Sequence, residues 1–137
     1  MSVQNTMQQN HKHCDELFAV AEQAVFSKDW DSADNAWQQF ISELESHITD
    51  KEEGKLFPAL EAVHGNIGPI HVMRGEHDHM RSLVAQINES LAAKDDQQFL
   101  GLSETLMMLM QQHNMKEEQI LYPMIDGSVP DAIALIS

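Results

Sequence analysis

The chain has 137 residues, of which 42% are hydrophobic and 22% are charged, a composition typical of a globular protein. Eight Lys and Arg stand against 22 Asp and Glu, and the formal net charge of −14 argues against a nucleic-acid partner, whose phosphates need a basic surface. No run of about 18 apolar residues is present, so we expect no membrane span. The single cysteine permits no internal disulfide, which favours the cytoplasm. We expect a single domain over residues 1–137.

Apolar residues recur at intervals of three and four, whereas the alternation typical of strands is nearly absent. In chain order, four helical stripes are predicted: Leu17, Phe18, Ala21, Val25; Trp37, Phe40, Ile41, Leu44; Leu83, Val84, Ile87, Leu91; and Leu102, Leu106, Leu109, Met110. Breaks are predicted at residues 27–31, 64–69, 93–96 and 125–131. This pattern predicts an all-α fold, an antiparallel up-down four-helix bundle with a short C-terminal extension over residues 131–137.

The two halves of the chain repeat each other at a shift of 66 residues. The shift places three residues on their counterparts: His11 on His77, Lys28 on Lys94, and His47 on His113. In each half, one histidine lies 17 residues before the turn and the other 19 residues after it. A rise of ~1.5 Å per residue returns the chain to within roughly 3 Å of the same depth. Four histidines on four helices are therefore predicted in one layer of the bundle.

Helix boundaries show the same repeat in their capping residues. Either Asp29 or Asp31 is predicted to cap the second helix, and either Asp95 or Asp96 the fourth. The proline at position 69 suits the first turn of the third helix.

Four imidazoles in an apolar interior are costly unless a metal satisfies their nitrogen atoms. Helix bundles hold dinuclear metal sites that are built from Glu and His on facing helices. Glu117 follows His113 by four residues, which places both side chains on one face of a helix. In the first half, position 51 holds a lysine, and the candidate carboxylates are Glu52 and Glu53.

The prolines favour Glu52, with Glu53 as the alternative. Glu52 precedes Pro58 by the same interval by which Glu117 precedes Pro123. Glu52 then lies five residues after the histidine at position 47, and on a regular α-helix the two side chains would diverge by roughly 140°. A π-bulge absorbs one inserted residue, so we predict a π-bulge here. The neighbouring acidic residues, Glu53 and Glu118, are expected behind the ligands or at the surface.

A family resemblance lies in four segments: NHKHCDELF, HITDKEEGKLFP, VMRGEHDHMR and QQHNMKEEQILYP. They resemble the motifs of hemerythrin-like HHE cation-binding domains over essentially the whole chain. The resemblance implies a four-helix bundle that holds two non-haem iron ions, bridged by carboxylates and by an oxo or hydroxo group. It also implies which residues bind the irons: His11, His47, His77 and His113 as terminal ligands, and Glu52 and Glu117 as bridges.

The chain departs from the family pattern in the third helix. Oxygen-carrying members have a second histidine four residues before the position of His77, and this chain has Met73 there. One iron is therefore expected to lack a nitrogen ligand, which leaves its position to water or to a side chain such as Tyr122 or His71. Phe57, directly before Pro58, is the counterpart of Tyr122, directly before Pro123. The simpler expectation is that Tyr122 packs in the core as Phe57 does.

The remaining polar candidates have weaker signals. Asp15, four residues after His11, is a candidate to orient that imidazole. His13, His64 and His79 are expected to face solvent.

The sequence predicts a protein that binds a carboxylate-bridged di-iron centre and reversibly binds or senses O₂ or a related small oxidant, NO or peroxide. Three alternatives stay open: a di-iron enzyme acting on peroxide or NO, an iron store or donor, and a protein-binding bundle with a vestigial site. No general acid or base is evident beyond the ligands, which favours a metal- and O₂-binding protein over an enzyme. The oligomeric state is open.

Overall fold

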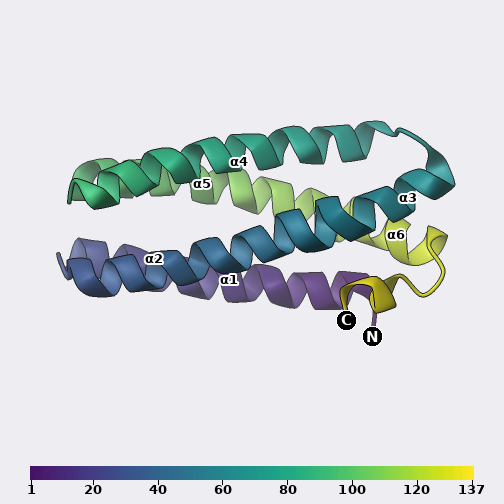
Figure 1. Ribbon diagram of the computed structural model, residues 1–137, viewed down its shortest axis with the longest axis horizontal. Helices are drawn as coiled ribbons and strands as arrows, with labels where there is room; N and C mark the ends of the chain where they lie inside the picture. The colour runs from purple at the N-terminus through teal and green to yellow at the C-terminus, as the bar shows by residue number, and fades with distance from the viewer.

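Two hairpins of long helices form the fold, and a computed structural model describes them over residues 1–137. In the first hairpin, α1 (Val3–Phe26) runs against a long rod made of α2 (Trp30–Glu45), the π-helix η1 (Ser46–Leu56) and α3 (Phe57–His64). In the second, α4 (Gly68–Ala92) runs against a rod made of α5 (Asp96–Lys116), the π-helix η2 (Glu117–Leu121) and α6 (Tyr122–Ser128). The hairpins lie side by side, α1 against α5 and α2 against α4 (Figure 1). The predicted antiparallel four-helix bundle is confirmed.

The turn inside each hairpin is built the same way. Lys28 and Lys94 both adopt the left-handed backbone conformation, with φ angles of 58° and 53°. Asp29 and Asp95 follow them, and each side chain accepts a backbone N–H in the first turn of the next helix. The first aspartate of each candidate pair is thus the N-cap, and the sequence repeat holds in the backbone.

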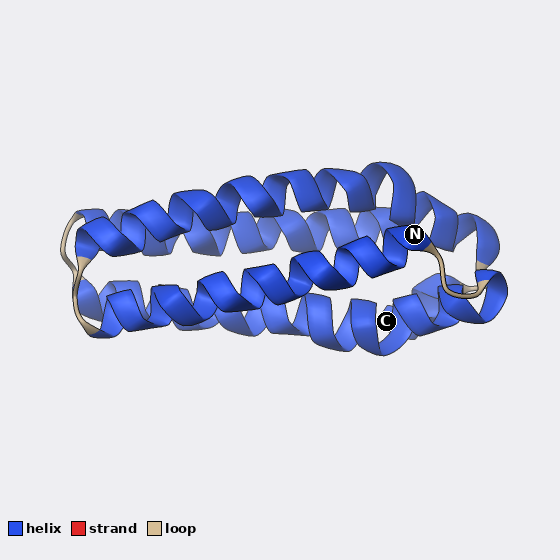
Figure 2. Cartoon of the chain, turned by 90° about the horizontal axis from the view of Figure 1, so that it is seen from above, coloured by secondary structure: helices blue, strands red, loops and turns tan.

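The other connections lie at the opposite end of the bundle (Figure 2). Pro69 stands in the first turn of α4, as predicted. The break expected over residues 125–131 comes later than predicted, because α6 continues to Ser128. After it, the 3₁₀-helix η3 (Ala132–Ile136) packs against α1 and η1. Both chain termini lie close together toward this end of the bundle (Figure 1).

Two apolar clusters divide the interior. A turn-end cluster of 17 buried residues includes Phe18, Trp37, Phe40 and Phe99. A terminus-end cluster of 11 buried residues includes Met7, Leu56, Met73 and Tyr122. On each long helix, the predicted ligands lie between residues of the two clusters, as His11 lies between Met7 and Cys14. The polar layer is therefore sealed by apolar side chains on both sides.

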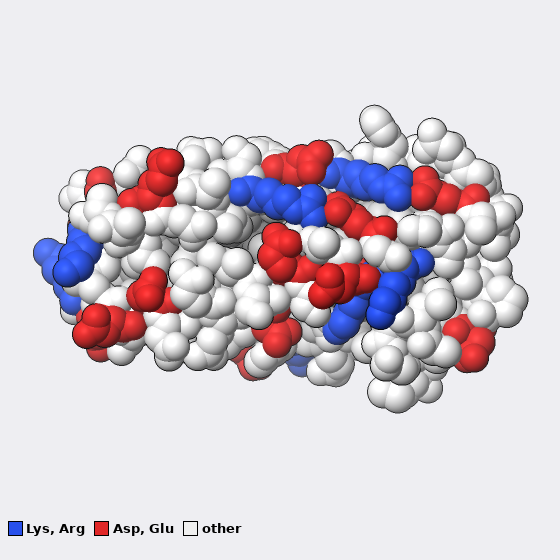
Figure 3. All heavy atoms as spheres, in the orientation of Figure 1, with Lys and Arg blue, Asp and Glu red and all other residues white.

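The surface carries the charge. On the face drawn in Figure 3, acidic and basic side chains alternate, and the basic ones form no continuous patch. None of the helices combines the length and the apolar character that crossing a bilayer requires.

Candidate metal centre

The structure brings all six predicted ligand residues into one buried layer. None of these six residues is more than 6% exposed. Their ligand atoms form two groups, each with atoms within 4.8 Å of one another: Glu52, His77, His113 and Glu117; and His11, His47 and Glu117. We refer to these groups as the His77–His113 half-site and the His11–His47 half-site. Glu117 belongs to both.

The π-helix η1 explains how Glu52 reaches the layer. The backbone N–H of Phe57 donates to the carbonyl of Glu52, five residues earlier, instead of four as in an α-helix. Pro58 follows and has no N–H to donate, so an α-helical bond at that position is impossible. A π-helix has more residues per turn than an α-helix, so His47 and Glu52, five residues apart, lie nearly above one another and both are buried in the layer. The predicted π-bulge is confirmed, and it extends over 11 residues.

A second π-helix, which the sequence reasoning did not foresee, starts at Glu117. The backbone N–H of Tyr122 donates to the carbonyl of Glu117, again five residues earlier, and Pro123 follows. Glu117 lies on the same helix face as His113, four residues earlier, because the backbone remains α-helical up to Lys116. The LFP and LYP segments therefore produce the same local backbone in both halves.

Each histidine points Nε2 into the layer and Nδ1 toward a polar partner behind it. The partner atoms are Glu118 Oε2 at 2.7 Å from His11, Asn10 Oδ1 at 3.5 Å from His47, Glu53 Oε2 at 2.7 Å from His77, and Glu76 Oε1 at 2.8 Å from His113. Such partners fix the tautomer and the orientation of a metal-binding imidazole. We call these four residues the supporting residues.

Cations hold three of the four supporting residues. Arg81 donates to Glu53, Lys116 donates to Glu76, and Lys51 donates to Asn10 at 2.7 Å. The expected location of Glu53 and Glu118 behind the ligands is confirmed.

The role expected of Asp15 is wrong, because Glu118, not Asp15, bonds to His11. Asn10 and Glu76 were missed. The 66-residue shift places one on the other, directly before the first histidine of each half, and this signal was present in the sequence.

Tyr122 lies in the centre of the layer, so the expectation that it only packs like its counterpart is wrong. Its side chain is fully buried, and its hydroxyl oxygen lies 2.7 Å from the carboxylate of Glu52 and 2.9 Å from that of Glu117, one of which accepts its single proton. The same oxygen lies 3.2 Å from Nε2 of His11 and 3.2 Å from Nε2 of His47.

Four ligand atoms in the layer have no hydrogen-bond partner although they are buried. They are Glu52 Oε1, His77 Nε2, His113 Nε2 and Glu117 Oε2. Buried polar atoms in native proteins are nearly always paired, so such a convergent group needs a partner that accepts electron pairs. A cation fits this donor set of imidazole and carboxylate. The cluster is compatible with metal binding.

Comparison with protein families agrees with this geometry. The family model described as hemerythrin HHE cation binding domain matches residues 2–125. The chain belongs to this family. The search of curated proteins and the search of solved structures each find no match.

Charge in this hemerythrin HHE domain is balanced within the layer. Burial raises the pKa of Glu52 well above its usual range, and the negative charge of Glu117 adds to this. Burial acts the same way on Glu117, but the charge of His113 and hydrogen bonds from its neighbours outweigh it and hold that pKa well below its usual range. Of the two carboxylates, Glu52 is therefore the one that takes up a proton more readily, and Glu117 the one that keeps its charge more readily.

The histidines differ in their protonation. Burial lowers the pKa of His47 to about 4, so this imidazole is neutral and ready to bind a metal. Burial also opposes the charged form of His113, but Glu117 and Glu76 outweigh it and raise the pKa of His113.

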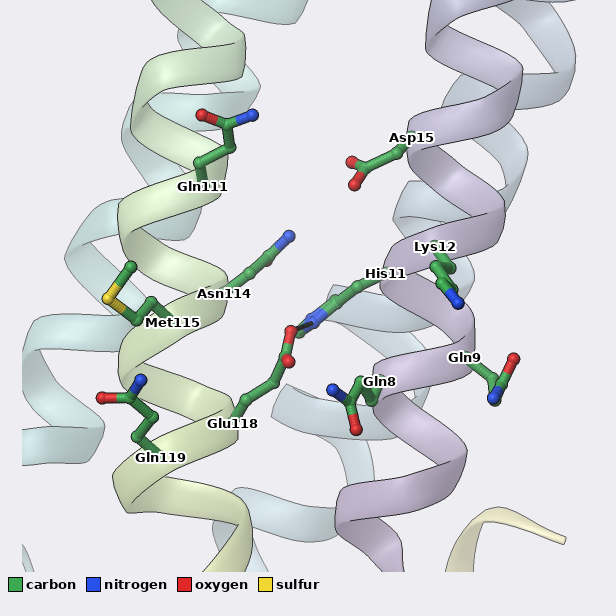
Figure 4. A pocket seen from close by; sticks show the side chains of 10 residues that line it. All are labelled: Gln8, Gln9, His11, Lys12, Asp15, Gln111, Asn114, Met115, Glu118 and Gln119. Atoms are coloured by element: carbon green, nitrogen blue, oxygen red, sulfur yellow. Dashed lines mark hydrogen bonds and ion pairs between the residues drawn. The ribbon is translucent and has the colours of Figure 1, made fainter.

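A polar groove of about 560 Å³ opens the layer to solvent beside His11. It runs between α1 and the rod of α5 and η2, and Figure 4 shows His11 and Glu118 meeting across it. Asp15, on the same stretch of α1, is also part of its lining. His11 is the most exposed of the six residues, at 6%, so the buried layer comes nearest to solvent at this groove.

In α4, the position at which oxygen-carrying family members have a second histidine holds Met73, which packs in the apolar interior. Met73 is 3% exposed and belongs to the terminus-end cluster. His71 is exposed and does not enter the layer. His13, His64 and His79 are exposed, as expected.

Proposed function

We propose that this hemerythrin HHE domain holds two iron ions, one in each half-site, and that it reversibly binds or senses O₂ or a related small oxidant, NO or peroxide. The four histidines act as terminal ligands, and Glu52 and Glu117 bridge the ions. The observation that supports this most strongly is the set of four convergent, unpaired ligand atoms in a fully buried layer. Imidazole and carboxylate ligands suit iron, and two iron ions, when bound, supply the electrons that a small oxidant accepts.

The chain's own residues prepare this chemistry. The supporting residues fix the Nε2 atoms inward, so little rearrangement is needed when an ion binds. The two apolar clusters exclude water from above and below the layer. A small ligand then has one polar route, the groove that ends at His11 and Glu118.

A binding role fits the site better than an enzymatic one. The polar groups close to the layer are ligands, supporting residues or the buried phenol of Tyr122. None of these groups is left free to act as a general base, because the supporting residues are already bonded to histidines and the others face the ions. We place the protein in the cytoplasm, where its one cysteine, Cys14, stays a thiol. Burial and the nearby charge of Glu43 raise the pKa of this thiol to about 12.

The iron content tests the proposal. We expect close to two irons per chain after anaerobic loading with ferrous iron. Exposure to air should produce a near-ultraviolet band from a bridged ferric pair, and cycles of reduction and air should restore it. Less than half an iron per chain would sink the proposal.

A pair of variants tests the ligand assignment. Glu52→Ala should lose at least one ion, because a bridging carboxylate holds two cations. The matched variant Glu53→Ala changes the next residue, which only supports His77, and it should keep both ions with affinity reduced by about 10–100-fold. Chelator competition measures both values, and circular dichroism verifies that each variant is folded. Loss of iron from Glu53→Ala but not from Glu52→Ala would contradict the assignment.

A further inference from the structure

The two half-sites are related by the sequence repeat, and they differ at two positions. Behind the histidines, Asn10 stands where the repeat places Glu76. After the prolines are aligned, Tyr122 stands where the first half has Phe57. The lysines at positions 51 and 116 match, and so do the acidic pairs at 52–53 and 117–118. Both departures bear on the same half-site, that of His11 and His47.

The first departure removes a negative charge. His77 and His113 are supported by the carboxylates of Glu53 and Glu76. His11 is supported by a carboxylate, but His47 faces the neutral amide of Asn10 at 3.5 Å, which Lys51 already contacts. The His11–His47 half-site therefore has one supporting carboxylate fewer than its counterpart, and it offers less compensation to a bound cation.

The second departure adds an oxygen atom to the same half-site. The phenol oxygen of Tyr122 is surrounded by ligand atoms at hydrogen-bonding distances: Nε2 of His11 and of His47 at 3.2 Å, and one oxygen each of Glu52 and Glu117 at 2.7 and 2.9 Å. An ion held by these atoms has the phenol oxygen beside it. Neither histidine of this half-site has an unpaired Nε2 atom, because the two Nε2 atoms lie 3.0 Å from each other and each lies 3.2 Å from the hydroxyl.

Phe57 shows that the other half-site has no such atom. Its ring stacks on the ring of His77, with centroids 5.7 Å apart and an interplanar angle of 8°. The hydroxyl is thus an addition to one half-site of a repeated structure, the same half-site in which a supporting carboxylate is replaced by Asn10.

We propose that Tyr122 is a direct ligand of the ion in the His11–His47 half-site and binds it as a phenolate. This inference rests on the proposed di-iron function. On binding, the O–H bond of the phenol breaks, an oxygen–metal bond forms, and one proton leaves to solvent through the groove beside His11; no electron is transferred. The phenolate supplies the negative charge that Asn10 does not.

Optical spectroscopy of the iron-loaded protein tests the inference. Phenolate bound to ferric iron absorbs in the visible, and resonance Raman excitation in that band enhances ring vibrations of the phenolate. Tyr122 is the only tyrosine among the 137 residues, so the assignment is unambiguous. We expect the band in the ferricyanide-oxidised wild type and its absence in Tyr122→Phe. We also expect the affinity of one of the two ions in that variant to fall by at least about tenfold.

Phe57→Leu is the matched control, because it removes an aromatic ring beside the other half-site and leaves the phenol in place. This variant should keep the visible band. Two bound irons in the wild type without a phenolate band would overturn the inference and leave the di-iron proposal intact. A folded wild type that binds no iron would overturn both, and iron analysis alone distinguishes the two results.

Discussion

At the scale of residues, each acidic pair divides its work between the two hairpins. Glu52 enters the layer, and its neighbour Glu53 supports His77 on the opposite hairpin. Glu117 likewise enters the layer, and Glu118 supports His11. In each pair, one carboxylate thus faces the buried layer and the next one supports a histidine of the facing hairpin, which explains why a helix interior carries them side by side.

Protons compete with the metal at two of these residues, which leads to a pH prediction. Without metal, the pKa values of His113 and Glu52 are both raised, and a proton on either group must leave before that group binds a cation. Metal affinity should therefore rise with pH up to the raised pKa of His113 and level off above it. The slope should be roughly tenfold per pH unit for each proton released. Competition with a chelator for a redox-inert ion such as Zn²⁺ measures it.

The stability of the metal-free protein should change with pH in the opposite direction to metal affinity. A raised histidine pKa stabilises the fold fully below 6.5, and this contribution is lost as pH rises through the raised value. Glu76→Gln removes one cause of the raised pKa of His113 and should shift the rise in metal affinity to lower pH. An affinity that does not change with pH in this range would contradict the assigned protonation states.

At the scale of elements, the π-helix η1 depends on a residue without a side chain. A Cβ atom at Gly54 would lie 2.9 Å from the carbonyl oxygen of Thr49, five residues earlier. That oxygen belongs to the backbone of the same π-helix, so it cannot move without changing the turn that carries Glu52.

Gly54→Ala should therefore destabilise the metal-free protein by about 1–3 kcal/mol, the usual cost of overpacking, and should weaken metal binding as well. Gly75→Ala and Gly101→Ala are matched controls, because nothing lies within 4 Å of a Cβ atom at either position. In a helix interior these changes should stabilise by roughly 0.5–1 kcal/mol. Denaturant unfolding compares the free energies of unfolding of the three variants. A Gly54→Ala protein as stable as the wild type would show that the π-helix accommodates a Cβ atom at position 54 without strain.

At the scale of the whole molecule, the polar layer ties together all four long helices. Each of the four long helical segments contributes one histidine to the layer: His11, His47, His77 and His113. The two apolar clusters lie on either side of these histidines. Without a cation, four buried atoms of the layer make no hydrogen bond of regular geometry, and a buried polar atom left fully unpaired costs about 1–3 kcal/mol. Carboxylate oxygens at 3.1 Å from His77 Nε2 and 3.2 Å from His113 Nε2 offset part of this cost.

Metal removal should therefore lower the melting temperature, since binding free energy at such a site is also folding free energy. We expect a loss of at least about 3 kcal/mol, or roughly 10 °C for a chain of this size. Thermal unfolding by circular dichroism, before and after dialysis against a chelator, measures it, and reloading with iron should reverse it. An identical melting curve for both forms would mean that the ions do not bind in the layer.

The sequence by itself determined the helices, their order and the ligand layer. Apolar spacing and the repeat sufficed, because a helix has a fixed rise and a hairpin returns the chain to a known depth. The π-helix at Glu52 also followed from sequence, because prolines mark the register in both halves. Supporting partners such as Glu76 and Asn10 were within reach of the same repeat.

Only the tertiary structure decided what touches what across the layer. Tyr122 and Phe57 occupy equivalent positions in the two halves, and the spacing of Tyr122 along its helix is that of an ordinary core residue. The structure shows that its hydroxyl is surrounded by four polar atoms of the layer. His11 takes Glu118 from a residue 107 positions away rather than Asp15 one turn along its own helix. Local spacing fixes the direction of a side chain along its own helix. The rotation and packing of the four helices against one another fix which side chain on another helix it meets.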